Sequence, residues 1–147
     1  MNFTLKTFQQ LTNIELYNVL KERTEVFVVE QNCPYPEVDG KDVQSYHLFR
    51  EEKGEIIAYL RILPPGVSYE ELSIGRVLVK KAYRGQKLAQ QLMTEALHFI
   101  HNELKEPTVK IQAQEYLSQF YESFGFEAIS EVYLEDNIPH IDMILKR

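Results

Sequence analysis

The residues with the clearest chemical potential lie in a short basic segment that follows an apolar stretch. LSIGRVLVK ends at Lys80, and a glycine and three further cations follow within seven residues. The first turn of a helix has unpaired N–H groups and the positive end of the helix dipole, so it attracts anions. If a helix begins here, this segment is a candidate phosphate or pyrophosphate site, formed by Arg84, Gly85, Gln86, Lys87, Leu88 and Ala89.

The segment does not match the common nucleotide-binding patterns. It lacks the G-x-x-x-x-G-K-[ST] spacing and the G-x-G-x-x-G spacing, and Gly75 lies inside the preceding strand rather than at its end. A strand–turn–helix connection with one glycine is also common without any ligand. The residues alone therefore leave an anion site and an ordinary structural turn as alternatives.

Charge is segregated along the chain. Lys80, Lys81, Arg84 and Lys87 place four cations within eight residues, with no acid among them. Residues 25–42 contain one base, Lys41, and five acids: Glu25, Glu30, Glu37, Asp39 and Asp42. One segment favours anionic ligands and the other favours cationic ligands, and two solvated faces of opposite charge are the alternative.

Length and composition limit the class of protein. The 147 residues fit one domain over 1–147, and 44% apolar with 26% charged residues is typical of globular proteins. A net charge of −6 disfavours general nucleic-acid binding, which depends on Lys and Arg at phosphates. The single cysteine excludes an intrachain disulfide, and the histidine spacing predicts no metal site. Without a signal peptide or an apolar run of ~18–20 residues, we expect a cytoplasmic protein that binds no membrane.

Periodicity predicts the elements that position these residues. Alternating or continuous apolar residues predict strands over 3–7, 47–51, 55–63, 72–80, 109–114, 126–137 and 140–146. Helices are predicted from a capping box at Thr12 and Glu15 to about residue 29, over 86–103, and over 118–124 before Gly125. Residues 32–42, with two prolines and a glycine, are predicted to form a loop, and Asn137–Pro139 a turn.

This order of elements predicts a mixed α/β (α+β) fold with one dominant sheet. The central strand–helix–strand unit is expected to have a right-handed crossover. Arg76 lies inside the predicted central strand, where an unpaired charge would be costly to bury. We therefore expect an acidic partner for Arg76 or an opening toward solvent.

The basic turn also resembles a known motif. Arg84-Gly85-Gln86-Lys87-Leu88-Ala89 is similar to the acyl-CoA-binding pattern Q/R-x-x-G-x-G/A of the GNAT acetyltransferase superfamily, with Lys87 at the middle glycine. FYESFGF (120–126) is similar to a second signature, an aromatic pair before x-x-x-Gly-Phe. Three longer stretches resemble the ElaA-like subgroup: VFVVEQNCPYPEVDGKD (26–42), AQEYLSQFYESFGF (113–126) and EDNIPHIDM (135–143). The resemblance covers essentially the whole chain.

The resemblance implies a single-domain acyl-CoA N-acyltransferase fold. Such a fold has a mixed, mostly antiparallel sheet with a splayed central strand and helices on both faces. The implied cosubstrate is acetyl-CoA, with no metal. Its pantetheine arm would pair with the backbone of Val77, Leu78 and Val79, its pyrophosphate would lie on the turn 84–89, and Gln114 would contact the donor or the acceptor. The N–H of Leu78 would face the developing oxyanion.

The resemblance also implies direct acetyl transfer to a primary amine of a small molecule or peptide. Tyr121 matches the position of the general acid, and a phenol of pKa ~10 is protonated at neutral pH. Packing beside Phe120 and Phe124 is the alternative role. A cationic acceptor would contact four acidic side chains and a histidine: Glu30, Glu37, Asp39, Asp136 and His140. One of these five residues, or Glu135, would act as the base.

Two other functions remain open at this point. A non-catalytic CoA-binding sensor or interaction module of the same fold would keep the basic turn without needing Tyr121. An α/β interaction domain would bind no nucleotide at all. Homodimers are common in the superfamily, so a homodimer is a further expectation.

Overall fold

The computed structural model describes residues 3–147, so the first two residues of the predicted domain lie outside the described part. The strands are β1 (Thr4–Thr7), β2 (Tyr46–Glu52), β3 (Glu55–Leu63), β4 (Leu72–Val79), β5 (Thr108–Gln114), β6 (Glu127–Ala128), β7 (Tyr133–Glu135) and β8 (Ile138–Lys146). The helices are α1 (Asn13–Arg23), α2 (Leu88–His98) and α3 (Ser118–Glu122). Wider π-helical turns extend α1 over Thr24–Glu30 and α2 over Phe99–Leu104.

All eight strands form one mixed sheet in the order β1-β2-β3-β4-β5-β8-β6, with β7 also paired to β8. Within residues 3–147, β4 and β5 form the one parallel pair, and every other pairing is antiparallel. The predicted mixed, mostly antiparallel sheet is confirmed. α2 connects the two parallel strands, as the predicted strand–helix–strand unit requires.

The centre of the sheet is irregular on both sides of β4. The parallel pairing with β5 covers Leu72–Val109 and Ser73–Lys110, after which the two strands diverge. On the other side the register with β3 shifts, so that Leu60 faces two residues of β4, Arg76 and Val77. This is a β-bulge, and Arg76 has a left-handed φ of 54°. The predicted splayed central strand is therefore confirmed, with a bulge at its middle.

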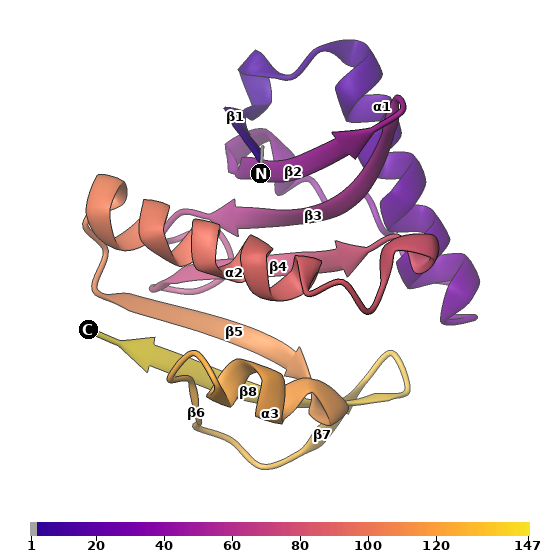
Figure 1. Ribbon diagram of the computed structural model, residues 1–147. Coiled ribbons are helices and arrows are strands. Elements are labelled where there is room, and N and C mark those ends of the chain that lie inside the picture. The colour runs from indigo at the N-terminus through magenta and orange to yellow at the C-terminus, as the bar shows by residue number, and fades with distance from the viewer. Residues whose placement is uncertain (1–2) are drawn as a thin grey trace.

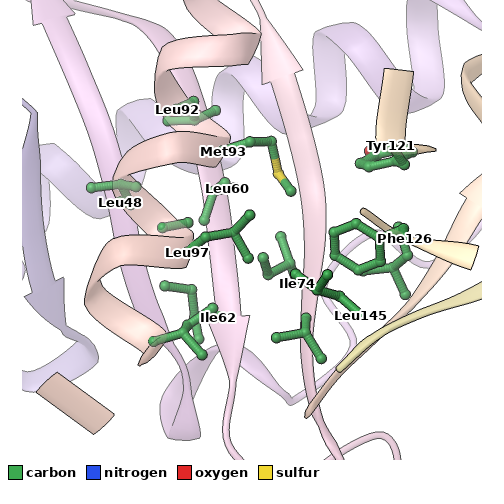
Figure 2. Packing of buried hydrophobic residues seen from close by; sticks show 14 of the residues in the cluster. Leu48, Leu60, Ile62, Ile74, Leu92, Met93, Leu97, Tyr121, Phe126 and Leu145 are labelled. Carbon is green, nitrogen blue, oxygen red and sulfur yellow. The ribbon is translucent and has the colours of Figure 1, made fainter. Parts of the chain in front are cut away.

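Helices cover both faces of the sheet, as predicted. α2 and α3 lie on the side that faces the viewer in Figure 1, and α1 lies on the other side. The larger core packs α2 residues such as Leu92 and Met93 against Leu60, Ile62 and Ile74 of the strands (Figure 2). A smaller core packs Val19 and Val26 against the opposite face.

The predicted strand over 126–137 is wrong, because this segment forms two short strands, β6 and β7, on the same side of β8. Between them the side chain of Ser130 takes a place in the hydrogen-bond ladder: its Oγ accepts from the Asp142 N–H at 2.9 Å. A side chain in the ladder displaces the strand backbone from its regular path.

The predicted turn at Asn137–Pro139 is displaced by one residue. The turn lies at Asp136 and Asn137, whose φ values are 50° and 65°, and β8 has already begun at Ile138. Asp and Asn tolerate left-handed backbone better than most residues, which places the turn there. Pro139 needs no ladder donor toward β5, since the β5 pairing starts at His140.

Candidate active site

One cavity of about 960 Å³ lies where β4 and β5 diverge. Its walls come from β4, the turn before α2, β5, α3 and loops that are distant in sequence. All of the predicted site residues except Glu37 and Gln86 line it: Glu30, Asp39, Val77, Leu78, Val79, Arg84, Gly85, Lys87, Leu88, Ala89, Gln114, Tyr121, Asp136 and His140. The fold therefore brings the basic turn and the acidic segment into one space.

The backbone of β4 presents hydrogen-bond donors to this cavity. The Lys80 N–H donates to the Ile57 carbonyl at 2.8 Å, so it points toward β3. Backbone direction alternates along a strand, so the N–H of Leu78 also points toward β3, while those of Val77 and Val79 point toward the gap. The expectation that Leu78 offers its N–H to an oxyanion is therefore wrong. Val77 and Val79 provide the free donors.

The turn before α2 exposes further N–H groups. Gly85 has a φ of 85°, and Lys87, the residue that precedes α2, has a φ of 63°. The bond from the Gln91 N–H to the Lys87 carbonyl (3.1 Å) starts the helical pattern. The three preceding N–H groups, at residues 88–90, are therefore not used within the helix. They lie beside the cavity together with the positive end of the helix dipole.

Arg84 is held in place by an ion pair. Its Nη1 and Nη2 bind the two carboxylate oxygens of Glu30 at 2.6 and 2.9 Å, and its Nε donates to the Val79 carbonyl at 2.9 Å. The hydrogen bond from Arg84 lowers the pKa of Glu30. Lys87 forms no ion pair within residues 3–147. The turn therefore has one cation already paired and one cation free.

Tyr121 lies on α3 at the other side of the gap. Its side chain is buried, with edge contacts to Phe120 and Phe126. Burial raises the pKa of Tyr121 to about 12. No hydrogen-bond partner of its hydroxyl lies within residues 3–147, and Tyr121 lines the cavity. The aromatic packing thus fixes a protonated hydroxyl whose hydrogen-bonding capacity is unused.

The acidic segment is neutralised by arginines in an arrangement that we call the charge cluster. Its members are three arginines and three acids from five parts of the chain: Arg23, Glu37, Asp39, Asp42, Arg61 and Arg76. Arg23 is fully buried and binds Glu37 and Asp42, both at 2.7 Å. Arg23 and the two carboxylates that bind it are thus almost entirely shielded from solvent.

The other two arginines complete the charge cluster. Arg61 binds Asp39 at 2.6 Å and Asp42 at 2.9 Å, and Arg76 binds Glu37 at 2.7 Å. Burial alone would raise the pKa of Asp39 and Asp42, but the arginine hydrogen bonds and charges outweigh it and lower both pKa values. The expected acidic partner of Arg76 is confirmed as Glu37.

The charge cluster changes the interpretation of the predicted acceptor residues. Glu37 is buried, binds two arginines and does not line the cavity, so its expected role as an acceptor contact is corrected. Asp39 and Glu30 line the cavity but are also paired with arginines. Asp136 and His140 have no ion pair within residues 3–147, and His140 Nδ1 interacts with the Ile138 carbonyl at 2.7 Å.

Arg23 and Arg61 were not among the predicted site residues. A signal was present, because Arg23 falls on the apolar stripe of its helix and Arg61 inside the apolar run EIIAYLRIL. Charged residues in such positions require buried partners. Gln114, which was predicted, donates to the Gln31 side chain at 3.2 Å and so links β5 to the loop that follows α1.

Within residues 3–147 no group of three or more His, Cys, Asp or Glu side chains is arranged to hold a metal ion. The Cys33 thiol lies at the cavity and donates to the Asp136 carbonyl at 3.5 Å. No helix in the described part of the chain is long and apolar enough to cross a membrane.

Comparisons with known proteins agree with this arrangement. The family model described as "Acetyltransferase (GNAT) domain" matches residues 6–147. Protein ElaA of Escherichia coli K12 is 44% identical over 136 residues, which cover 91% of this chain and 89% of that protein. The crystal structure of E. coli ElaA matches with a TM-score of 0.92, at 41% identity over 99% of this chain and all of that chain.

Two further solved structures match. An acyl-CoA N-acyltransferase from Pseudomonas aeruginosa matches with a TM-score of 0.93 and 46% identity, over 98% of both chains. An aminoglycoside 6'-N-acetyltransferase complexed with coenzyme A matches with a TM-score of 0.68 over 97% of this chain and 96% of that chain. Its identity is 13%, so this likeness concerns the fold alone.

Proposed function

The chain belongs to the GNAT acetyltransferase family, with close similarity to ElaA, and we propose that it transfers an acetyl group from acetyl-CoA directly to a primary amine. The resemblance inferred from the motifs is thereby confirmed at the level of the family. One observation carries the proposal. The free backbone donors of β4 and the unpartnered hydroxyl of Tyr121 line the same cavity, which extends to the basic turn before α2.

The donor would bind along the diverging strands. The pyrophosphate would lie on the N–H groups at the start of α2, beside Lys87. The pantetheine arm would take the place of the missing neighbour of β4 and accept a hydrogen bond from the Val79 N–H. The thioester carbonyl oxygen would then accept a hydrogen bond from the Val77 N–H, which stabilises the oxyanion as the amine attacks.

The chemistry needs three proton transfers: to the leaving thiolate, from the attacking nitrogen and back to the phenolate. The amine nitrogen bonds to the carbonyl carbon, and the C–S bond then breaks. The leaving thiolate takes the proton of the Tyr121 hydroxyl, whose raised pKa keeps it protonated throughout the neutral range. The nitrogen loses a proton to a base, and the phenolate regains one from solvent, so that the products are CoA thiol and an amide.

The base would be one of the acidic or histidine side chains that line the cavity. Most amines are largely protonated at neutral pH, so a proton must leave before or during attack. Three of the predicted candidates have no arginine partner in the described residues: Glu135, Asp136 and His140. The Nδ1 of His140 interacts with the Ile138 carbonyl of the same strand, which leaves Nε2 available for the amine.

The test separates binding from turnover. Calorimetric titration should detect acetyl-CoA and not ATP, because ATP has phosphates but no pantetheine arm. With an amine that supports thiol release, Tyr121→Phe should lower kcat about 10²-fold or more, while the Kd for acetyl-CoA stays within about twofold. Tyr17→Phe, which changes an exposed tyrosine on α1, should leave both values unchanged.

Two results would contradict the proposal. If acetyl-CoA does not bind, it cannot be the acetyl donor. Tight binding with no thiol release from any amine would favour the non-catalytic CoA sensor or interaction module instead.

A further inference from the structure

One wall of the cavity carries positive charge beyond what its acids neutralise. The charge cluster contains three arginines and three carboxylates, so its formal charges cancel. Lys41, in the loop that carries Glu37 and Asp39, adds one more positive charge to this wall. Its Nζ donates to the Ser68 hydroxyl at 2.9 Å, and it has no acid within ion-pair distance among residues 3–147. The wall therefore has a surplus cation at the cavity.

Arg76, which lines the same cavity as Lys41, adds an unused donor edge. Its Nε and Nη2 bind Glu37 and Asp39, whereas Nη1 has no partner within the described residues. The side chain is 20% exposed, lines the cavity and lies over the Tyr35 ring at 5.6 Å. Two anchored nitrogens and an aromatic neighbour thus fix the direction of this guanidinium.

A third cation lies behind the first two. Arg61 is 97% buried, since 3% of its surface is exposed, and its Nε has no hydrogen-bond partner. Gly75 has no side chain to cover it: a Cβ there would lie 3.9 Å from the Arg61 Nε. Both residues line the cavity. The Arg61 Nε–H is itself inaccessible, so Arg61 adds positive potential behind the wall rather than a direct contact with a ligand.

These donors lie next to the proposed reaction centre. Arg76 immediately precedes Val77, whose N–H faces the gap between β4 and β5. An anion held at Arg76 would therefore lie within a small molecule's length of the thioester carbon. Asp136 and His140 also line the cavity, and their side chains suit an amine.

We propose that the acceptor amine also carries a carboxylate, as an amino acid does. The carboxylate pairs with Lys41 and the free edge of Arg76, and this contact orients the amine toward the thioester. This inference rests on the proposed function and specifies its substrate class. A polycationic acceptor, which the acidic segment by itself favours, would instead meet neutralised acids and the surplus positive charge of Lys41.

The experiment compares matched acceptors. A panel of amino acids is assayed by thiol release, each beside its carboxamide and its decarboxylated amine. The carboxamide has the less basic and hence more often neutral amine, so chemical reactivity alone favours it at pH 8. We expect instead a kcat/KM at least about 10-fold higher for the free acid, because a charge-assisted hydrogen bond is stronger than a neutral one.

Lys41→Gln should reduce that preference about 10-fold and leave kcat/KM for the carboxamide within about twofold. Lys21→Gln, on the exposed surface of α1, should change neither value. A readout without turnover supports the same point: calorimetry should show N-acetylated amino acids binding more weakly to the Lys41→Gln variant, and N-acetylated amides unaffected. A thermal melt of the variant confirms that it is folded.

The outcomes distinguish the two proposals. Carboxamides or decarboxylated amines that match the free acids overturn carboxylate recognition, while acetyl transfer stands. If Lys41→Gln keeps the preference for the free acid over the carboxamide, the assignment of carboxylate binding to this wall is overturned. Absence of thiol release with every amine overturns the proposed function, and the binding of N-acetylated amino acids then decides separately whether the wall recognises carboxylates.

Discussion

The two sides of the cavity are built in different ways. The side proposed to bind acetyl-CoA, which we call the donor side, uses backbone groups of residues that are close in sequence, from Val77 and Val79 to the start of α2. The side proposed to bind the acceptor, which we call the acceptor side, uses side chains from distant parts of the chain, such as Asp39 and Arg61. A local motif can specify the first kind of site. The second kind exists only after the sheet and the loops have come together.

The ion pairs of the two sides also differ in burial. Arg84 and Glu30 on the donor side are 40% and 32% exposed, whereas the Arg23 side chain in the charge cluster is 0% exposed. Exposed pairs contribute ~0–1 kcal/mol, while removal of one partner from a buried pair costs ~3–5 kcal/mol. The same kind of contact should therefore hold the fold on one side and be dispensable on the other.

The largest expected effect comes from Arg23→Met. This change leaves the carboxylates of Glu37 and Asp42 buried with one arginine fewer, so we expect the free energy of unfolding to fall by about 3–5 kcal/mol. Arg84→Met is the matched control and should cost less than about 1 kcal/mol. Urea denaturation measures both values. Equal losses in the two variants would show that burial does not separate the two sides.

The next effect is the dependence of stability on pH. The folded-state pKa of Asp42 is lowered, so its contribution is fully present above the unfolded-state pKa of ~3.9 and is lost as pH falls through the folded value. The stability difference between the wild type and Asp42→Asn should therefore be greatest at neutral pH and shrink below about pH 4. Urea denaturation from pH 7 to pH 3 measures it.

The difference between variants is the useful quantity here, because His47 also titrates. Its Nε2 interacts with the Asp42 carbonyl at 2.9 Å, and burial lowers the pKa of His47. Burial and the backbone contact act on His47 in both proteins, and only the smaller effect of the Asp42 charge, which raises the pKa of His47, is lost in Asp42→Asn. A stability difference that stays constant down to pH 3 would contradict a charged, arginine-bound Asp42.

The smallest effect is expected from Glu30→Gln on the donor side. The change releases Arg84 from its carboxylate partner and makes it available to phosphate, so acetyl-CoA should bind about 2–5-fold more tightly. The free energy of unfolding should change by less than about 1 kcal/mol. Calorimetry measures the affinity, and Glu25→Gln, on the same helical segment, is the control. Weaker binding would mean that Glu30 positions Arg84 for the ligand.

The sequence was sufficient for most of the fold and for the general location of the site. Its periodicities predicted the hairpin of β2 and β3, the β4-α2-β5 unit and the short α3 that carries Tyr121. These features depend on neighbouring residues. The strand predicted over 126–137 failed because Ser130 bonds to Asp142, twelve residues further along the chain, and no local pattern contains that contact.

The details of the site depended on register and on distant partners. The choice between the N–H groups of Leu78 and Val77 follows from the pairing of β4 with β3, which a single strand does not reveal. The acids of residues 25–42 indicated a negative site because their partners could not be seen. Arg61 and Arg76 come from two later strands, and together with Arg23 they neutralise the three acids of the charge cluster.

The divergence of β4 and β5 also bears on how the protein avoids aggregation. Unpaired strand edges invite intermolecular β-pairing, and proteins limit this hazard with very short edge strands. Here the outer strands are short, with four residues in β1, two in β6 and three in β7. The longer free edges, β4 beyond Ser73 and β5 beyond Lys110, border an interior cavity. The longest unpaired strand edges are therefore open to a narrow, flexible ligand and shielded from the strand of another molecule.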